Sequence, residues 1–175
     1  MDIKDAIAEL DKLIAKKGLS YVLYTCGGAQ LILLGYTTRR TVDVDLIQDK
    51  IDEPLRLASL EVARKLKIQD DWLNNKVSTL SQRLGNGWKK KTDILFDGKA
   101  ITLMGLNRQD LISSKLHAAI DRKGEDYEDL LFLKPSIAEI EIARKYVLKQ
   151  KSDVETSEIF INAWVKELKN DLGCN

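Results

Sequence analysis

The sequence has few of the residues that build covalent frameworks or zinc sites. Its 175 residues include only two cysteines, two prolines and one histidine. Cys26 and Cys174 provide neither a disulfide framework nor a Cys-x-x-Cys pair. A single histidine largely excludes a His-rich metal site and a Ser-His-Asp triad drawn from several histidines. A metal ion would therefore be held mostly by carboxylates, which favours Mg²⁺ or Mn²⁺ over Zn²⁺.

The chain also lacks a charge bias, a long apolar run and a leader segment. Lys and Arg number 28 against 27 Asp and Glu, so the net charge of +1 does not mark an obligate nucleic-acid binder. The longest apolar runs, such as residues 31–34, are far shorter than the roughly 20 residues that span a bilayer. Residues 1–10 include Asp2, Asp5 and Glu9 and contain no apolar stretch of a signal peptide. We therefore expect a cytoplasmic protein.

What is present is an ordinary soluble composition, 44% hydrophobic and 31% charged, without an internal repeat. The order of apolar patterns predicts an α+β (mixed α/β) fold, with a small mixed sheet flanked by helices and a helical C-terminal part. We expect residues 1–105 to form the α/β core. Residues 106–175 are expected to pack on it as helices, within a single compact unit.

The individual elements follow from the apolar spacing and from the Gly and Pro positions. The expected strands cover residues 21–26, 42–48, 88–96 and 99–104. The expected helices cover residues 2–17, 29–34, 55–66, 107–122, 126–133, 136–149 and 157–168. Residues 73–84 are compatible with either an irregular or a helical segment.

A pair of glycines, Gly27 and Gly28, separates the first expected strand from a short helix. Glycine allows a tight turn and a close approach of backbone N–H groups to a ligand. Phosphate is the natural ligand at such a place, because a helix N-terminus attracts anions. An ordinary turn also uses this pair, so the two glycines alone decide nothing.

Two carboxylates, Asp43 and Asp45, alternate with apolar residues in the second expected strand. Residues i and i+2 of a strand point to one face, so the carboxylates are expected side by side while Val42, Val44 and Leu46 face a core. Two such carboxylates repel each other unless a cation lies between them. Mg²⁺ ions bound to such a pair assist phosphoryl transfer. The alternative is an edge strand with a solvated acidic face.

In combination, these motifs resemble the signature of the nucleotidyltransferase superfamily. The residues are Gly27-Gly28-Ala29, a short helix, Arg39-Arg40-Thr41 and Asp43-Val44-Asp45. The similarity is closest to small bacterial toxin-type members, the MNT, AbiEii and MenT-like groups, and it spans residues 21–133. It implies that the glycine turn, Gly27, Gly28 and Ala29, binds nucleotide phosphates and that Asp43 and Asp45 hold Mg²⁺.

The sequence departs from this family at Ala29, where Ser or Thr often supplies a hydroxyl to a phosphate. Backbone N–H groups or the next side chain, Gln30, would then serve instead. Arg39 and Arg40 fit two roles, because a guanidinium can bind the triphosphate or the acceptor, or can lie in a solvated turn.

The resemblance also implies a third carboxylate on a later strand. Asp93 matches this position, and Asp97 is its rival, although Asp97 followed by Gly98 suits a hairpin turn better. Lys89, Lys90 and Lys91 precede the same strand. They either guard a sheet edge or bind RNA phosphate.

Lys115 is expected inside an apolar stripe of the helix at 107–122. With Leu111 at 0°, Lys115 lies at about 40° on the helical wheel, whereas His117 lies on the polar side and is expected at the surface. A lysine in an apolar stripe must reach water, a carboxylate or a phosphate. It either extends along the margin of the stripe to solvent or points into an active-site cleft.

Asp126 and Asp129 lie one helical turn apart in the next helix. They are either partners of the helix dipole or site residues. The resemblance favours the second role: Lys115 and Asp129, with Asp126 as a close second, would face the nucleotide. An ion pair between Lys115 and either aspartate is the expected resting state.

The resemblance implies an enzyme that transfers a nucleoside monophosphate from an NTP, with Mg²⁺ or Mn²⁺, to an acceptor hydroxyl. Catalysis would depend on Asp43, Asp45, Asp93 and Lys115. The acceptor would be a tRNA 3′ end or a protein, in a toxin–antitoxin pair with a cognate antitoxin as partner. The alternative is a catalytically degenerate nucleotide-binding or protein-interaction module on the same fold.

Overall fold

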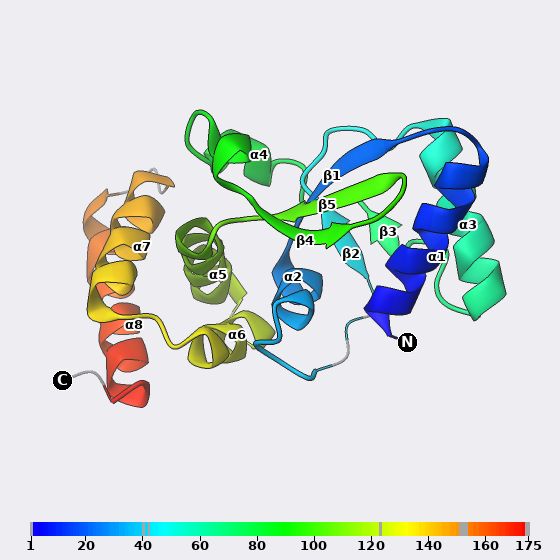
Figure 1. The fold of residues 1–175 in the computed structure, drawn as a ribbon. Helices are drawn as coiled ribbons and strands as arrows, with labels where there is room; N and C mark the ends of the chain where they lie inside the picture. Colours follow the sequence, from blue (N-terminus) through cyan, green and yellow to red (C-terminus); the bar gives the residue numbers. More distant parts are fainter. Residues whose placement is uncertain (1, 40, 42, 123, 151–153, 174–175) are drawn as a thin grey trace. The chain divides into compact units, whose positions relative to one another are not determined.

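The computed structural model describes residues 2–39, 41, 43–122, 124–150 and 154–173 (Figure 1). The chain forms two compact units, Met1–Leu106 and Asn107–Asn175. Within the described ranges there are eight α-helices and one five-stranded mixed sheet, so the predicted α+β class is confirmed. None of the described helices is long and apolar enough to cross a membrane.

The first unit contains the sheet. Its strands lie in the order β3-β2-β1-β5-β4, with β1 parallel to β5, β2 parallel to β3 and the other two pairs antiparallel. Its elements in chain order are α1 (Ile3–Lys16), β1 (Tyr21–Cys26), α2 (Gly27–Leu33), β2 (Val44–Leu46), α3 (Glu53–Leu66), β3 (Leu73–Asn74), α4 (Leu80–Arg83), the 3₁₀ helix η1 (Trp88–Lys91), β4 (Asp93–Asp97) and β5 (Ile101–Gly105).

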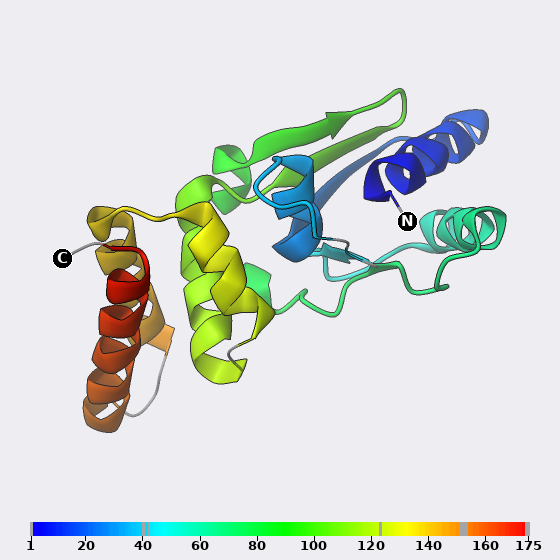
Figure 2. The same ribbon diagram turned by 90° about the horizontal axis from the view of Figure 1, so that it is seen from below.

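One face of this sheet is covered by α1 and α3, which lie side by side (Figure 2). Leu23 of β1 is buried against them, while its neighbour Val22 is 54% exposed on the opposite face. Ile94 of β4 is 62% exposed. The strands thus alternate between a buried face and an open face. The aliphatic strand residues that are at most 1% exposed are Leu23, Val44, Leu46, Ile101 and Leu103.

Side-chain caps explain where the long helices of this unit begin. Asp2 accepts a hydrogen bond from the backbone N–H of Lys4 at 2.9 Å, and α1 begins at the next residue, Ile3. Asp52 accepts from the N–H of Leu55 at 3.0 Å, and Pro54 lies in the first turn of α3. The cap at Asp52 explains why α3 begins two residues before the predicted start at position 55.

Two predicted strands differ from the structure. The strand expected at 42–48 is confined to Val44–Leu46, and position 42 lies outside the described residues. The first part of the strand expected at 88–96 is the helix η1. Trp88 is buried there, with its ring 5.2 Å from that of Tyr24 in a T-shaped arrangement. This packing holds the three lysines out of the sheet, which resumes at Asp93.

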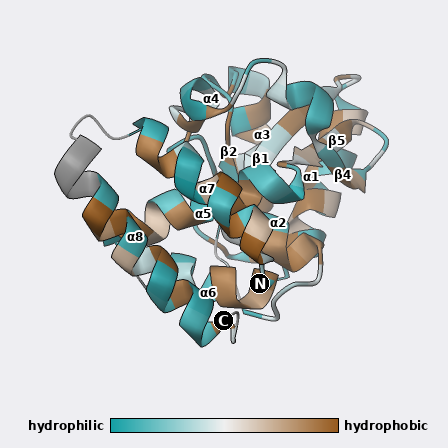
Figure 3. Cartoon of the chain, turned by 90° about the vertical axis from the view of Figure 1, so that its left-hand side faces the viewer, coloured by the Kyte–Doolittle hydropathy of each residue, from teal (hydrophilic) through white to brown (hydrophobic). Residues whose placement is uncertain are grey.

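The second unit is helical. It consists of α5 (Arg108–Arg122), α6 (Glu125–Leu133), α7 (Ile137–Gln150) and α8 (Val154–Asp171), of which α5 packs against α6 and α7 and α7 against α8 (Figure 3). The predicted cap Asn107 is confirmed, because its side-chain oxygen accepts from the N–H of Asp110 at 3.0 Å. The prediction that His117 lies at the surface is wrong: its side chain is only 12% exposed and approaches Asp121.

A buried carboxylate, Asp11 of α1, joins this helix to the turn between β4 and β5. Asp11 is 7% exposed and accepts hydrogen bonds from the backbone N–H groups of Lys99, Ala100 and Ile101 at 3.1, 2.7 and 2.8 Å. Burial opposes ionisation, but these three donors lower the pKa of Asp11 below its ordinary value of 3.8.

We expect Asp11→Ala to lower the free energy of unfolding by about 3 kcal/mol, because it leaves three backbone donors without their charged acceptor. The pKa of Asp11 is depressed in the folded state, so its contribution is present above about pH 4 and is lost as the pH falls through the folded pKa. Urea unfolding at a series of pH values from about 3 to about 7 measures this. Glu61→Gln, an exposed change in α3, is the control; an equal loss in both variants contradicts the prediction.

Candidate functional site

The acidic pair is formed by Asp43, directly before β2, and Asp45, in the middle of that strand. Val44 and Leu46 are completely buried, whereas Asp43 and Asp45 are half-buried. In the sheet register Asp45 is opposite Cys26 of β1 and Asn74 of β3, whose side chains share its face. The pleat of β2 therefore directs the Asp45 carboxylate to the open side of the sheet.

The glycine turn lies directly beside these carboxylates. Gly27 has φ +77°, and a Cβ atom added there would lie 3.6 Å from Oδ2 of Asp45. A Cβ atom on Gly28 would lie 3.4 Å from Oγ1 of Thr41 and 3.5 Å from Nη2 of Arg39. Both glycines thus permit a close approach of other side chains as well as the turn itself.

The two glycines form the first turn of α2, which the sequence predicted to begin at Ala29. The residue before them, Cys26, makes no side-chain capping hydrogen bond. The chain therefore passes from β1 into α2 without an intervening loop. This brings the first backbone N–H groups of α2 to the position of the acidic pair.

Thr41 is a site residue that the sequence analysis did not single out. Its hydroxyl donates a hydrogen bond to Oδ1 of Asp43 at 3.1 Å and lies against Gly28. A hydroxyl group is thus present at the glycine turn, although residue 29 is alanine. In the sequence, the feature that could have identified Thr41 as a site residue is its position two residues before Asp43. Arg40, predicted as a phosphate ligand, lies outside the described residues.

The side chains that follow the glycines point elsewhere. Ala29 is 2% exposed and belongs to the hydrophobic core, so only its backbone can meet a ligand. Gln30 is fully buried; its amide donates to the carbonyl of Leu106 at 2.6 Å and accepts from the N–H of Leu106 at 3.1 Å. The expectation that Gln30 serves a phosphate is therefore wrong, because both ends of its amide bond the backbone of Leu106.

Asp93 is separated from the acidic pair. It begins the edge strand β4 opposite Gly105, and the strands β1 and β5 lie between β4 and β2. Three strand spacings amount to about 14 Å. Asp97 lies at the other end of β4, where it accepts a hydrogen bond from Thr102 at 3.2 Å. The role of Asp93 as a third metal ligand stays a prediction.

The residues at β2 suit a magnesium ion by their donor chemistry. In the part of the chain that the structure describes, no three His, Cys, Asp or Glu residues are grouped closely enough to hold a metal. Mg²⁺, however, is usually bound by one or two carboxylates together with water and substrate phosphates. Asp43 and Asp45, both half-buried beside a turn suited to phosphate, provide such a partial set.

The second unit contains a buried ionic network. Nζ of Lys115 lies 2.8 Å from Oδ1 of Asp126 and 2.6 Å from Oδ2 of Asp129, and Nε of Arg122 lies 2.7 Å from Oδ2 of Asp126. Lys115, Asp126 and Asp129 are 7%, 6% and 0% exposed. The predicted ion pair is confirmed with both aspartates. The predicted contacts of these three residues with a nucleotide stay predictions.

Burial and pairing act in opposite directions on this network. Burial alone would lower the pKa of Lys115, but the charges and hydrogen bonds of Asp126 and Asp129 raise it above 10.5. Burial would raise the pKa of Asp126, but Lys115 and Arg122 lower it below 3.8. Two positive and two negative side chains balance each other, so the network as it stands offers no net charge to a ligand.

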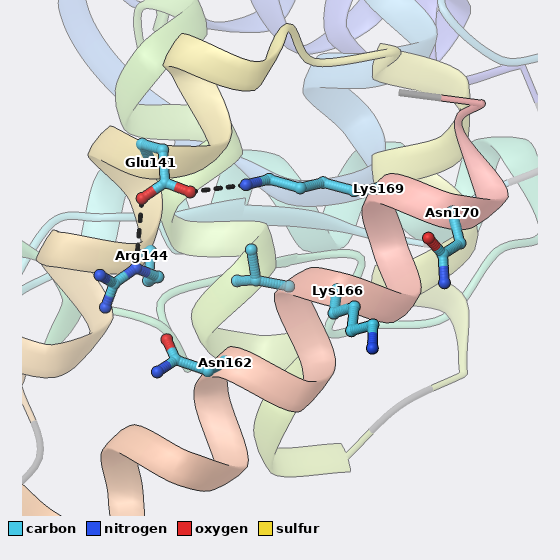
Figure 4. Close-up of a pocket in the computed structure, with 7 residues that line it drawn as sticks. Glu141, Arg144, Asn162, Lys166, Lys169 and Asn170 are labelled. Carbon is cyan, nitrogen blue, oxygen red and sulfur yellow. Dashed lines mark hydrogen bonds and ion pairs between the residues drawn. The ribbon is translucent and has the colours of Figure 1, made fainter. Parts of the chain in front are cut away.

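A groove of about 390 Å³ lies between α7 and α8 (Figure 4). Its walls include Glu141, Arg144 and Lys169. Glu141 bonds Lys169 of α8 at 2.7 Å and Arg144 of its own helix at 3.2 Å, so these three charges are already paired with one another. We therefore assign these residues to the α7–α8 packing, and place the candidate site at the glycine turn of the first unit.

The fold and this turn define a class of protein in which a glycine-containing strand–helix junction faces an Asp-x-Asp strand. A family model described as "Nucleotidyltransferase of unknown function (DUF6036)" matches residues 2–163. The chain belongs to this family, which confirms the resemblance to the nucleotidyltransferase superfamily. No curated protein and no solved structure matches the chain.

We expect Lys115→Met to lower the free energy of unfolding by about 3–5 kcal/mol, because it removes the buried ammonium group that Asp126 and Asp129 share. The double variant Lys115→Met/Asp129→Asn should recover much of this loss, since Arg122 still balances Asp126. Calorimetric unfolding of the full chain at neutral pH checks both. Lys166→Met, exposed on α8, serves as the control.

The shifted pKa values of Asp126 and Lys115 determine how the stability of the fold changes with pH. The depressed pKa of Asp126 makes its contribution present above about pH 4 and lost as pH falls through the folded value. The raised pKa of Lys115 makes its contribution present below about pH 10 and lost as pH rises through the folded value. A Lys115→Met variant as stable as the wild type between these limits would disprove a stabilising role.

Proposed function

We propose that this protein is an Mg²⁺-dependent nucleotidyltransferase that transfers a nucleoside monophosphate from an NTP to an acceptor hydroxyl. The observation that carries the proposal is the position of Asp45 beside Gly27, with Asp43 joined through Thr41 to Gly28. The proposed site for a divalent ion and the proposed phosphate-binding turn therefore lie next to each other in the first unit. Membership of the nucleotidyltransferase family supports the same chemistry.

In the proposed reaction, an acceptor oxygen forms a bond to the α-phosphorus while the bond to the β-phosphate oxygen breaks and pyrophosphate leaves. Asp43 and Asp45 bind the metal, and the N–H groups of Gly27 and Gly28 bind phosphate oxygens. Mg²⁺, when bound, supplies positive charge against the charge of the transition state. Arg39, whose guanidinium lies against Gly28, adds charge from the chain itself.

The remaining roles follow the family resemblance. Asp93 is proposed to accept the proton of the acceptor hydroxyl. The resemblance also gives it the role of a third metal ligand, but a separation of about 14 Å from the acidic pair does not support a shared metal ion. Arg40, Lys115, Asp126 and Asp129 are proposed to contact the nucleotide. For Lys115 this role requires exchange of a carboxylate for a phosphate, because its ammonium bonds Asp126 and Asp129. The proposed setting is a cytoplasmic toxin–antitoxin pair.

A basic segment favours an RNA end over a protein as acceptor. Residues 72–92 contain five cationic residues and no Asp or Glu. All five are exposed, and they are Lys76, Arg83, Lys89, Lys90 and Lys91. The Lys89 ammonium lies 5.1 Å from the centre of the Tyr24 ring. Exposed lysines that neutralise backbone phosphates give affinity without sequence preference.

A second candidate is a nucleotide-binding or protein-interaction module that has lost catalysis. Two observations favour it: Ala29 replaces the usual hydroxyl residue, and Asp93 lies three strands away from Asp45. Such a module would bind Mg²⁺–NTP without turnover.

The transfer reaction is tested with labelled ATP, CTP, GTP and UTP, Mg²⁺ and a tRNA pool. We expect Asp43→Asn/Asp45→Asn to reduce labelling by about a thousandfold or more, because the phosphate charge is then no longer offset. The exposed neighbour Asp49→Asn is the matched control and should retain activity. Equal labelling by the wild type and the double variant would contradict the enzymatic assignment. Binding of NTP by the wild type without any labelling would favour the catalytically degenerate module.

The RNA acceptor is tested by replacing Lys89, Lys90 and Lys91 with Ala. We expect weaker RNA binding and a salt dependence reduced by up to about three phosphate contacts, because each lysine releases counterions. Fluorescence anisotropy over a salt series measures this, and NTP binding should stay unchanged. Alanine at Lys12 and Lys16 of α1 and at Lys17, the residue that follows this helix, is the control, because all three are exposed. The same effect in both triple variants would indicate non-specific attraction only.

A further inference from the structure

The edge strand β3 places a charged pair beside the candidate metal seat. β3 runs parallel to β2, with Leu73 opposite Val44 and Asn74 opposite Asp45. Lys76 lies in the turn two residues after Asn74, and Asp71 lies in a turn two residues before Leu73.

The side chain of Lys76 turns back along this edge. Its Nζ lies 2.6 Å from Oδ2 of Asp71, five residues earlier in the chain. The ion pair therefore spans β3, whose Asn74 is opposite Asp45. Between the two charged residues, the carbonyl of Trp72 accepts a hydrogen bond from the N–H of Val44, the residue after Asp43. The backbone supports this geometry, because the side-chain oxygen of Asn74 accepts from the N–H of Lys76 at 3.0 Å.

The electrostatics agree with this placement. The pKa of Lys76 is raised above its ordinary value, first by the hydrogen bond and charge of Asp71 and further by the charges of Asp43 and Asp45. Both members of the acidic pair thus act on the same ammonium group. Lys76 itself is exposed, so it can move without the cost of leaving a buried partner.

We propose that Lys76 is the resident counter-ion of the Asp43–Asp45 pair and a positioning residue for the nucleotide. In the absence of a divalent ion its ammonium offsets part of the repulsion between the two carboxylates. A divalent cation must compete with this charge, while the triphosphate of an incoming NTP is attracted by it. This inference rests on the proposed function, because it assumes that the acidic pair binds metal.

The charge of Lys76 should have opposite effects on the affinity for a divalent ion alone and on the affinity for a metal–NTP complex. The two effects can therefore be measured separately. Removing the charge of Lys76 should strengthen the binding of a divalent ion alone. It should weaken the binding of a metal–NTP complex. A purely structural role for the Asp71–Lys76 pair would change the stability of the fold and shift neither affinity in this pattern.

The test measures Mn²⁺ binding to the full chain by electron paramagnetic resonance, without a nucleotide. We expect Lys76→Met to raise Mn²⁺ affinity roughly threefold at low ionic strength, and the gain to vanish near 1 M salt, where the screening length is about 3 Å. Lys76→Arg keeps the charge and should bind like the wild type. The control is Lys65→Met, an exposed lysine that is paired with Glu9 in the same unit.

A second measurement titrates each variant with Mg²⁺ and a non-hydrolysable ATP analogue in a calorimeter. We expect a roughly threefold weaker affinity for Lys76→Met and none of this loss for Lys65→Met. Unchanged Mn²⁺ affinity in Lys76→Met, or weaker affinity, would overturn the inference.

The Asp43→Asn/Asp45→Asn variant separates this inference from the proposed function. If that variant binds Mn²⁺ as tightly as the wild type, the acidic pair is no metal seat and the proposed function fails. If it loses Mn²⁺ while Lys76→Met binds like the wild type, only the role of Lys76 fails.

Discussion

The repulsion between two carboxylates on one side of a short strand is the constraint on which the first unit depends. Val44 and Leu46 are completely buried, so the hydrophobic core holds in place the backbone segment that carries Asp43 and Asp45. The surroundings reduce the repulsion in part: Thr41 donates to Asp43, and Lys76 adds a positive charge nearby.

The second unit shows the opposite arrangement. Lys115, Arg122, Asp126 and Asp129 form a balanced set, and three of the four are buried. Taking any one partner away would leave a charge in a poorly hydrated environment, so the set is difficult to open. In the first unit, by contrast, the carboxylates of Asp43 and Asp45 are only half-buried.

Much of the fold was readable from the sequence where local chemistry decides it. The strand at 21–26 was predicted with its observed bounds, and the cap at Asn107 was correct because capping depends on neighbouring residues only. The alternation at Val44 and Leu46 follows from the pleat of a strand. The place of Lys115 in an apolar stripe likewise indicated a charged partner.

Contacts between distant segments were not readable in the same way. A two-residue strand such as β3 has no period to detect, so the pairing of Asn74 with Asp45 and the position of Lys76 were missed. Gln30 resembles any polar residue near a glycine turn until its two bonds to Leu106, 76 residues later, are known. His117 was misplaced because the helical wheel of α5 does not show what packs on its other side.

The two outer strands of the sheet are poor templates for backbone pairing between molecules. β3 has only two residues and is flanked by the charged pair of Asp71 and Lys76. β4 has an irregular register between Ile94 and Phe96 and begins after three lysines. Charge, brevity and bulges are the means by which sheet proteins avoid edge-to-edge aggregation. We therefore expect a macromolecule that recognises this unit to bind through side-chain contacts. Addition of a strand to the edge of the sheet is disfavoured.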